Sequence, residues 1–162
     1  MDIRMGVQGR VLAAFLEDAQ VKAAALAAGF AEELELLSKG MGSSSFWGMG
    51  ICYQGEALAR LGQVQEGIAC MRASLAQRRP KGDLCHQSGV LAALAVAQAS
   101  VGRLAEGLAT LAEALAFIET SGECHRESEL RRLQGELLLA QGDEAAAEAS
   151  LRRAVEVARR QA

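Results

Sequence analysis

Residues 102–122 read GRLAEGLATLAEALAFIETSG, a stretch that begins and ends with glycine. Between the two glycines, apolar residues recur at intervals of four and three, at Leu104, Leu108, Leu111, Leu115 and Ile118. This spacing places them on one face of an α-helix. A glycine beside such a stripe is typical of the residue at which one helix ends before the next begins. The stretch therefore predicts one amphipathic helix between two turns.

The same glycine spacing extends along the chain, with glycine every twenty residues at positions 42, 62, 82, 102, 122 and 142. Gly62, Gly102 and Gly142 separate helical runs, so we expect each to adopt the left-handed conformation of a tight turn. The other three lie in more polar segments, where we expect helix caps from Ser45 or Asp83 and a capping box from Thr120 and Glu123. The sequence thus predicts an antiparallel helical hairpin that is repeated with a period of 40.

The composition favours an all-α protein, because alanine and leucine supply most of the 51% hydrophobic residues and proline occurs once. We predict one domain, an all-α solenoid over residues 1–162, with repeats at 46–80, 84–120 and 124–161. The first helices of these repeats are expected at about 46–61, 84–101 and 124–141, the middle one covered on more than one side. The second helices carry similar stripes, one of Val64, Ile68, Met71 and Leu75, the other of Ala147, Leu151, Val155 and Ala158. Residues 8–40 read as a degenerate hairpin, or as a single long helix.

Small residues at fixed offsets within these hairpins resemble the tetratricopeptide repeat. They occupy Gly55, Ala95 and Gly135 in the first helices and Gly67, Gly107 and Ala147 in the second, where close helix crossing would require them. The chain departs from the usual pattern in its period of 40, and in having Ile51, Leu91 and Arg131 at the tryptophan position. The resemblance implies a right-handed superhelix with the first helices lining its concave face.

Two segments, residues 55–62 (GEALARLG) and 132–140 (RLQGELLLA), are similar to the C-terminal repeat region of large bacterial signalling ATPases. Those proteins carry a nucleotide-binding module, often with a cyclase, kinase or DNA-binding domain upstream. No upstream catalytic part is present in this sequence. The resemblance, which spans about residues 46–161, therefore implies a regulatory binding role without catalysis.

The expected ligand-binding site is the concave groove, with a small apolar floor from the middle repeat and walls of mixed charge. By the resemblance, its residues would be Met49, Cys52, Glu56, Arg60, Gly89, Ala92, Ala93, Val96, Ser100, Glu129, Arg132, Glu136 and Leu139. Such a groove suits an extended peptide or a helix of a protein partner. A self-assembling scaffold and a small-ligand sensor are the alternative functions.

Other candidate chemistry is weaker. The segment Gly40-Met41-Gly42-Ser43-Ser44-Ser45 lacks the lysine of a P-loop and reads as a loop with a helix cap. Cys85-His86 and Cys124-His125 supply zinc-type ligands, but adjacent helical residues diverge by about 100°, which disfavours chelation of one ion. Cys52 and Cys70 are expected to pack as small hydrophobes. We therefore predict no enzyme activity, catalytic residue, metal, cofactor or disulfide.

Charge and hydropathy bound the location and partners. The net charge of −3 gives no basic bias toward nucleic acid. No uncharged apolar stretch reaches the length of a membrane span, roughly 18 residues or more. We expect a cytoplasmic protein that binds neither nucleic acid nor membrane. Because no capping helix follows the last repeat, Leu133, Leu137 and Val155 are expected to be partly exposed and to support a two-fold homodimer through one end of the solenoid.

Overall fold

The computed structural model describes residue 29 and residues 44–81 and 86–161 of the chain. These residues form six α-helices and two short 3-10 segments, with no strand among them, so the all-α prediction is confirmed for this part. The elements are α2 (Ser44–Arg60), α3 (Val64–Arg78), η1 (Arg79–Lys81), α4 (Gln87–Ser100), α5 (Leu104–Ser121), η2 (Cys124–Arg126), α6 (Glu127–Gln141) and α7 (Glu144–Gln161). The hairpin predicted for residues 8–40 lies, residue 29 apart, outside the described residues.

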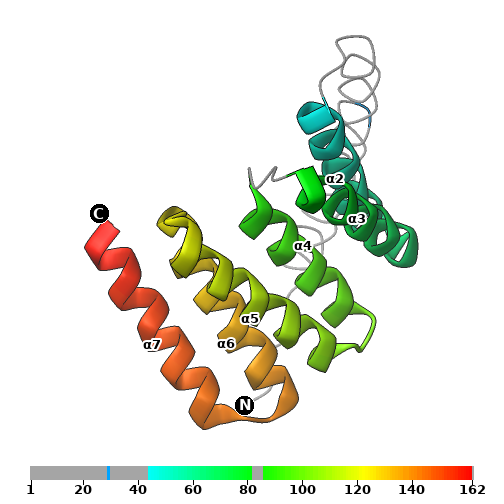
Figure 1. Ribbon diagram of the computed structural model, residues 1–162. Helices are drawn as coiled ribbons and strands as arrows, with labels where there is room; N and C mark the ends of the chain where they lie inside the picture. Colours follow the sequence, from blue (N-terminus) through cyan, green and yellow to red (C-terminus); the bar gives the residue numbers. More distant parts are fainter. Residues whose placement is uncertain (1–28, 30–43, 82–85, 162) are drawn as a thin grey trace, which may run out of the picture.

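The helices pack as three antiparallel hairpins, α2 on α3, α4 on α5 and α6 on α7. The hairpins follow one another in chain order (Figure 1), with α3 packed against α4 and α5 against α6. Helix α4 also contacts α2 and α6, which explains why most of its residues are buried. The sequence prediction that this apolar helix is covered on several sides is confirmed.

The three hairpin turns share one hydrogen-bond pattern. The amide of each glycine donates to the carbonyl three residues back, as from Gly102 to Ala99 at 2.9 Å. The next amide donates to the carbonyl five residues back, as from Arg103 to Gln98 at 3.0 Å. The same pair of bonds occurs at residues 62–63 and 142–143, and all three glycines have positive φ. This is the Schellman motif, which satisfies the last carbonyls of a helix, and it confirms the predicted left-handed turns.

Gly122 differs from the prediction, because it also takes the left-handed conformation, with φ of 73°. Its amide donates to Ile118 at 3.1 Å, four residues back, and so ends α5 by a single bond. The helix therefore runs through Thr120, whose hydroxyl donates to the carbonyl of Phe117 at 3.0 Å. The predicted capping box of Thr120 and Glu123 is wrong, because Thr120 lies inside α5 and the Glu123 carboxylate accepts a hydrogen bond from Ser88 at 2.9 Å.

Valine at Gly102 and valine at Gly122 are therefore expected to destabilise the fold by similar amounts, about 1–3 kcal/mol each. Nothing lies within 4 Å of a Cβ added at either position, so the cost comes from backbone strain alone. Urea unfolding measures it, with Ala109→Val on the exposed face of α5 as the control. A loss at Gly102 with none at Gly122 would show that the second turn relaxes.

Helices within each hairpin cross at their small residues. A Cβ on Gly67 would lie 2.4 Å from the carbonyl oxygen of Gly55. A Cβ on Gly107 would lie 2.9 Å from that of Ala95, and one on Gly135 3.2 Å from that of Ala147. The two members of each pair are twelve positions apart, and the pairs recur with the period of the repeat, so the three hairpins cross in the same register. The expectation that close crossing requires small residues is confirmed.

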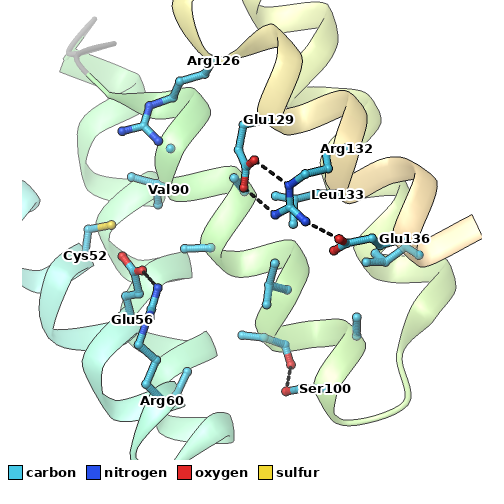
Figure 2. A pocket seen from close by; sticks show the side chains of 18 of the residues that line it. Cys52, Glu56, Arg60, Val90, Ser100, Arg126, Glu129, Arg132, Leu133 and Glu136 are labelled. Carbon is cyan, nitrogen blue, oxygen red and sulfur yellow. Dashed lines mark hydrogen bonds and ion pairs between the residues drawn. The ribbon is translucent and has the colours of Figure 1, made fainter. Parts of the chain in front are cut away.

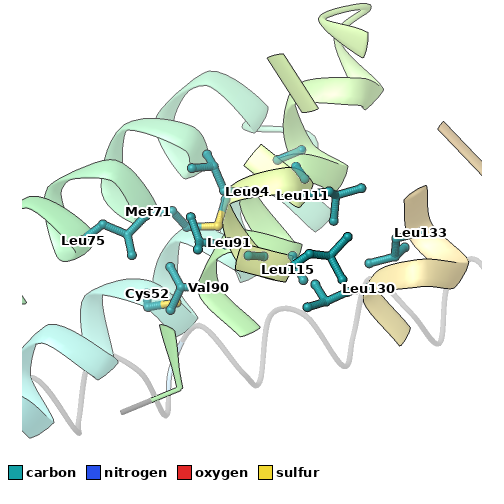
Figure 3. Close-up of a cluster of buried hydrophobic side chains, with 14 of the residues drawn as sticks. Cys52, Met71, Leu75, Val90, Leu91, Leu94, Leu111, Leu115, Leu130 and Leu133 are labelled. Carbon is teal, nitrogen blue, oxygen red and sulfur yellow. The ribbon is translucent and has the colours of Figure 1, made fainter. Parts of the chain in front are cut away.

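Side chains from successive hairpins form one core cluster (Figure 3). Met71 of α3, Leu91 of α4, Leu111 of α5 and Leu130 of α6 are among its fully buried members. Each lies on the apolar stripe of its own helix, so burying these stripes joins the hairpins into a continuous interior.

The remaining differences lie at helix ends and on α7. Helix α4 begins at Gln87, after His86 in a left-handed conformation, rather than at residue 84. Helix α6 begins at Glu127 after the η2 turn, and α2 already includes Ser45, whereas Asp83 lies outside the described residues. In α7 the buried residues are Ala147, Ala154 and Val157, while Val155 and Ala158 are exposed. The predicted α7 stripe is rotated because this helix packs chiefly on α6.

Candidate functional site

A groove of about 690 Å³ runs between α2 and α6, over α4. Helix α4 supplies its floor, which consists mainly of glycine, alanine and valine, including Gly89, Ala93 and Val96. Side chains of α2 form one wall, and those of α6 with Arg126 of η2 form the other (Figure 2). Because small side chains line the floor, the backbone of a ligand could approach α4 closely.

The structure brings most of the predicted site residues together in this groove. Those that line it are Cys52, Glu56, Arg60, Gly89, Ala92, Ala93, Val96, Ser100, Glu129, Arg132 and Glu136. Leu139 instead lies on the other side of α6, in a second depression that it shares with α7. The side chain of Met49 lies outside the described residues.

Two predicted groove residues are buried. For Ala92 this is contrary to expectation, whereas for Cys52 it confirms the predicted packing as a small hydrophobe and contradicts only its predicted exposure in the groove. Cys52 is 4% exposed and Ala92 is 8% exposed, and both belong to the hydrophobic core cluster. They occupy the bottom edges of the groove, where α2 and α4 approach each other. Val96, at 44% exposed, is the most accessible apolar side chain of the floor.

Sequence reasoning missed several lining residues, among them Tyr53, His86, Arg126 and Leu133. The period of the repeat contains the signal for two of them, because Tyr53 and Leu133 stand one period before and after the predicted residue Ala93. His86 and Arg126 also stand one period apart, each just before the first residue of its helix. Since the predicted site residues all lay within helices, this position was overlooked in both repeats.

Charges on the walls are largely paired within each helix. On α2, Arg60 donates to Glu56 at 2.8 Å. On α6, Arg132 makes a bidentate contact with Glu129, at 2.7 and 2.8 Å, and a further hydrogen bond to Glu136 (Figure 2). One arginine of α6 thus serves two carboxylates.

These contacts shift the ionisation of the α6 pair. The hydrogen bond from Arg132 holds the pKa of Glu129 below its ordinary value, against an opposing effect of burial and with added attraction from Arg132 and Arg126. The same hydrogen bond raises the pKa of Arg132. Both groups therefore stay charged at neutral pH. Their side chains are 44–49% exposed, so the pair contributes little to stability.

Arg126 differs from the other wall cations. Its Nε is buried and has no hydrogen-bond partner. Its guanidinium lies over Gly89, where a Cβ would be 3.2 Å from the guanidinium carbon. No carboxylate of the described residues forms an ion pair with it. Arg126 is thus a cation at the edge of the groove that makes no direct ion pair with a described carboxylate, although its charge attracts Glu129.

Cys52 carries a thiol at the α2 edge of the groove. Burial raises its pKa to about 12, with a further rise from Glu56 and a smaller opposing effect of Arg78. The thiol therefore remains protonated at neutral pH, and a protonated thiol is a poor nucleophile.

In a variant with Cys70, Cys85 and Cys124 changed to serine, we expect Ellman's reagent to label Cys52 at least about 100-fold more slowly in the folded chain than in urea. Adding Cys52→Ser should abolish the signal in both conditions. Equal rates would contradict the burial of this side chain.

The Cys-His pairs considered as metal ligands are not assembled by the described residues. Cys85 and the side chain of Cys124 lie outside them, and His86 is exposed. His125 is also largely exposed and lies 3.7 Å from Glu123. In the described ranges, no group of three or more histidine, cysteine, aspartate and glutamate side chains is placed to hold a metal ion.

At the far end of the chain, the predicted exposed stripe is only partly correct. Leu133 and Leu137 are buried, because they belong to the core cluster shared with the α4/α5 hairpin rather than to the end of the row of hairpins, and Leu137 lies beside Gly107 of α5. Val155 is 50% exposed and Leu139 is 56% exposed. The homodimer expected through this end stays a prediction.

Comparison of the chain with protein-family models, with curated proteins and with solved structures gives no match. Within the described ranges, no helix has both the length and the hydrophobicity needed to cross a membrane.

Proposed function

We propose that this chain is a tetratricopeptide-like array that acts as a non-catalytic protein-interaction module. Its ligand would be a peptide or a helix bound along the groove over α4. The observation that carries the proposal is the convergence of three helices on one groove, in which a floor of small apolar residues lies between charged walls. An apolar floor supplies burial, and polar groups at the edges supply orientation.

The charges favour one kind of ligand. Arg126 would attract a carboxylate of the ligand, because its Nε has no hydrogen-bond partner and it forms no direct ion pair with a described carboxylate. Glu136 would attract a basic group, because it shares Arg132 with Glu129. Arg126 lies just before the first residue of α6, and Glu136 lies in the C-terminal half of that helix. The preferred ligand thus carries an acidic group toward the η2 end of the groove and a basic group toward the other end, with small apolar side chains between them.

The wider assignment rests on the resemblance of the repeats. Hairpins that cross in one register in every repeat support a solenoid, and the right-handed superhelix belongs to the same proposal. Similarity of residues 55–62 and 132–140 to bacterial signalling ATPases supports a regulatory role in such a protein or a relative of it, in the cytoplasm. In that setting the groove would recognise a partner, and catalysis would belong to other domains.

A peptide-display selection on the full chain, followed by calorimetric titration of the recovered peptides, tests the groove. We expect Val96→Arg to weaken their binding at least about tenfold, since it places a large cation on the floor. The matched control is Ala109→Arg, which adds the same side chain on the exposed face of α5. Arg126→Glu should weaken selectively those peptides that carry the acidic group. Peptides unaffected by both groove variants would refute the proposed site.

A further inference from the structure

A second surface lies on α7, on the other side of α6 from the groove. Leu139, Leu151, Arg152, Val155 and Arg159 line a depression of about 560 Å³ there. Two of its apolar side chains, Leu139 and Val155, are 56% and 50% exposed. Exposed apolar side chains rimmed by charge are typical of a contact surface.

The α2/α3 hairpin shows what covers such a surface in this molecule. Met71 and Leu75 of α3 are buried in the core cluster with Leu91 and Leu94 of α4 (Figure 3). Beside them, Arg72 of α3 and Arg79 of η1 reach the second helix of the next hairpin. Arg72 donates to Glu106 at 3.0 Å, and Arg79 donates to Glu113. The apolar pair thus packs against α4, and the two arginines bind carboxylates of α5.

Helix α7 carries the same four kinds of side chain at the same repeat positions. Two repeat periods after Met71, Arg72, Leu75 and Arg79 stand Leu151, Arg152, Val155 and Arg159. The middle hairpin keeps only the apolar pair, with Ala112 and Glu119 in place of the arginines. The arginines are therefore not a general property of the repeat, and α7 matches α3 specifically.

Among the described residues, neither arginine of the α7 surface has an ion-pair partner from another helix. Arg152 pairs only with Glu148 among the described residues, one turn back on its own helix, at 2.6 Å. Arg159 forms no ion pair within the same part of the chain. Val155 is 50% exposed, whereas its equivalents Leu75 and Leu115 are 6% and 5% exposed beneath the following hairpin.

We infer that the α7 surface binds a helical hairpin of a partner polypeptide. The first helix of that hairpin is rich in small apolar residues, as α4 is, and covers Leu151 and Val155. Its second helix carries two carboxylates at the spacing of Glu106 and Glu113 in α5, and these pair with Arg152 and Arg159. This inference does not depend on the function proposed for the groove.

A peptide with the sequence of residues 86–122, which contains α4 and α5, is a direct probe. It is titrated against the full chain by fluorescence anisotropy. We expect saturable binding that Arg152→Glu with Arg159→Glu weakens at least about tenfold. A peptide carrying Glu106→Arg and Glu113→Arg should restore binding to that variant and bind the parent chain poorly. Val96→Arg, in the groove, should leave the affinity unchanged. The inference is overturned if the charge reversal leaves the affinity unchanged, or if Val96→Arg abolishes binding.

Because an isolated peptide can fail to fold, a tethered form provides the second measurement. Residues 82–122 are joined directly after Gln161. Arg152 and Arg159 then precede the added copies of Glu106 and Glu113 by the same number of residues as Arg72 precedes Glu106 in the native hairpins. We expect one unfolding transition with a higher Tm than that of the parent chain. Reversing the two arginines should lower this Tm, and reversing the two added glutamates as well should restore it.

Two outcomes overturn the inference in this format. The first is a tethered segment that is cleaved rapidly by protease while the parent fold is intact. The second is a chain without extension that sediments as a dimer, and that Val155→Glu converts to a monomer, because the surface is then occupied by a second copy.

Discussion

Replacing Gly67 by alanine is expected to destabilise the chain by about 2–4 kcal/mol. The added Cβ would lie 2.4 Å from the carbonyl oxygen of Gly55 and 2.8 Å from the amide nitrogen of Ala59. Both atoms belong to the backbone of α2, so no side-chain rotation relieves the contact. Separation of α2 from α3 would relieve it, at the cost of their packing. Alanine's helix propensity, about 1 kcal/mol better than that of glycine, offsets only part of this cost.

Gly89→Ala is the matched control, because the same change is made inside α4. Its Cβ would meet the guanidinium carbon of Arg126 at 3.2 Å, and that flexible side chain can move. We therefore expect a gain of up to about 1 kcal/mol from helix propensity. Urea unfolding of both variants measures the contrast. If Gly67→Ala also stabilised the chain, the two helices would not cross as closely as the structure has them.

The features that could be predicted from sequence are those with a local steric cause. A glycine that must adopt positive φ, or that must admit a neighbouring backbone, is constrained by its own missing side chain. The turns at Gly62, Gly102 and Gly142 and the crossing of Gly55 with Gly67 are of this kind. Because these constraints repeat with the period of the chain, the hairpins could be predicted from them, whereas the groove residues were predicted from the resemblance to the tetratricopeptide repeat.

Features set by the approach of separate helices could not be predicted in this way. Ala92 was expected to be exposed, and Cys52 was placed both among the exposed groove residues and among residues packed as small hydrophobes. Their burial depends on how closely α2 packs on α4. Thr120 matches a capping motif, yet the left-handed Gly122 lets α5 continue past it. Burial on α7 is similarly a consequence of its neighbours, because Val157 is buried against the rest of the chain while Val155, two residues before it, is exposed.

Truncating the side chain at one position of the repeat is expected to lower the free energy of unfolding by different amounts in successive hairpins. Met71, Leu111 and Leu151 are equivalent residues, each one period after the last. The first two are fully buried, and Leu151 is partly buried on the α7 surface. Truncation of a buried residue removes its transfer free energy and leaves a cavity, whereas truncation at a partly exposed site removes less contact and leaves space that water can fill.

Leu111→Ala is therefore expected to cost about 3–4 kcal/mol, and Leu151→Ala about 1–2 kcal/mol. Met71→Ala should fall near the Leu111 value, since Met71 is also fully buried. Urea unfolding of the three variants measures the series, provided that the free energy of unfolding falls with urea concentration at the same slope in each variant. Equal costs at Leu111 and Leu151 would mean that another copy or segment covers the α7 surface in solution. Repeating the Leu151 measurement at tenfold lower protein concentration decides between these, because cover by a second copy weakens on dilution, whereas cover from within the chain does not.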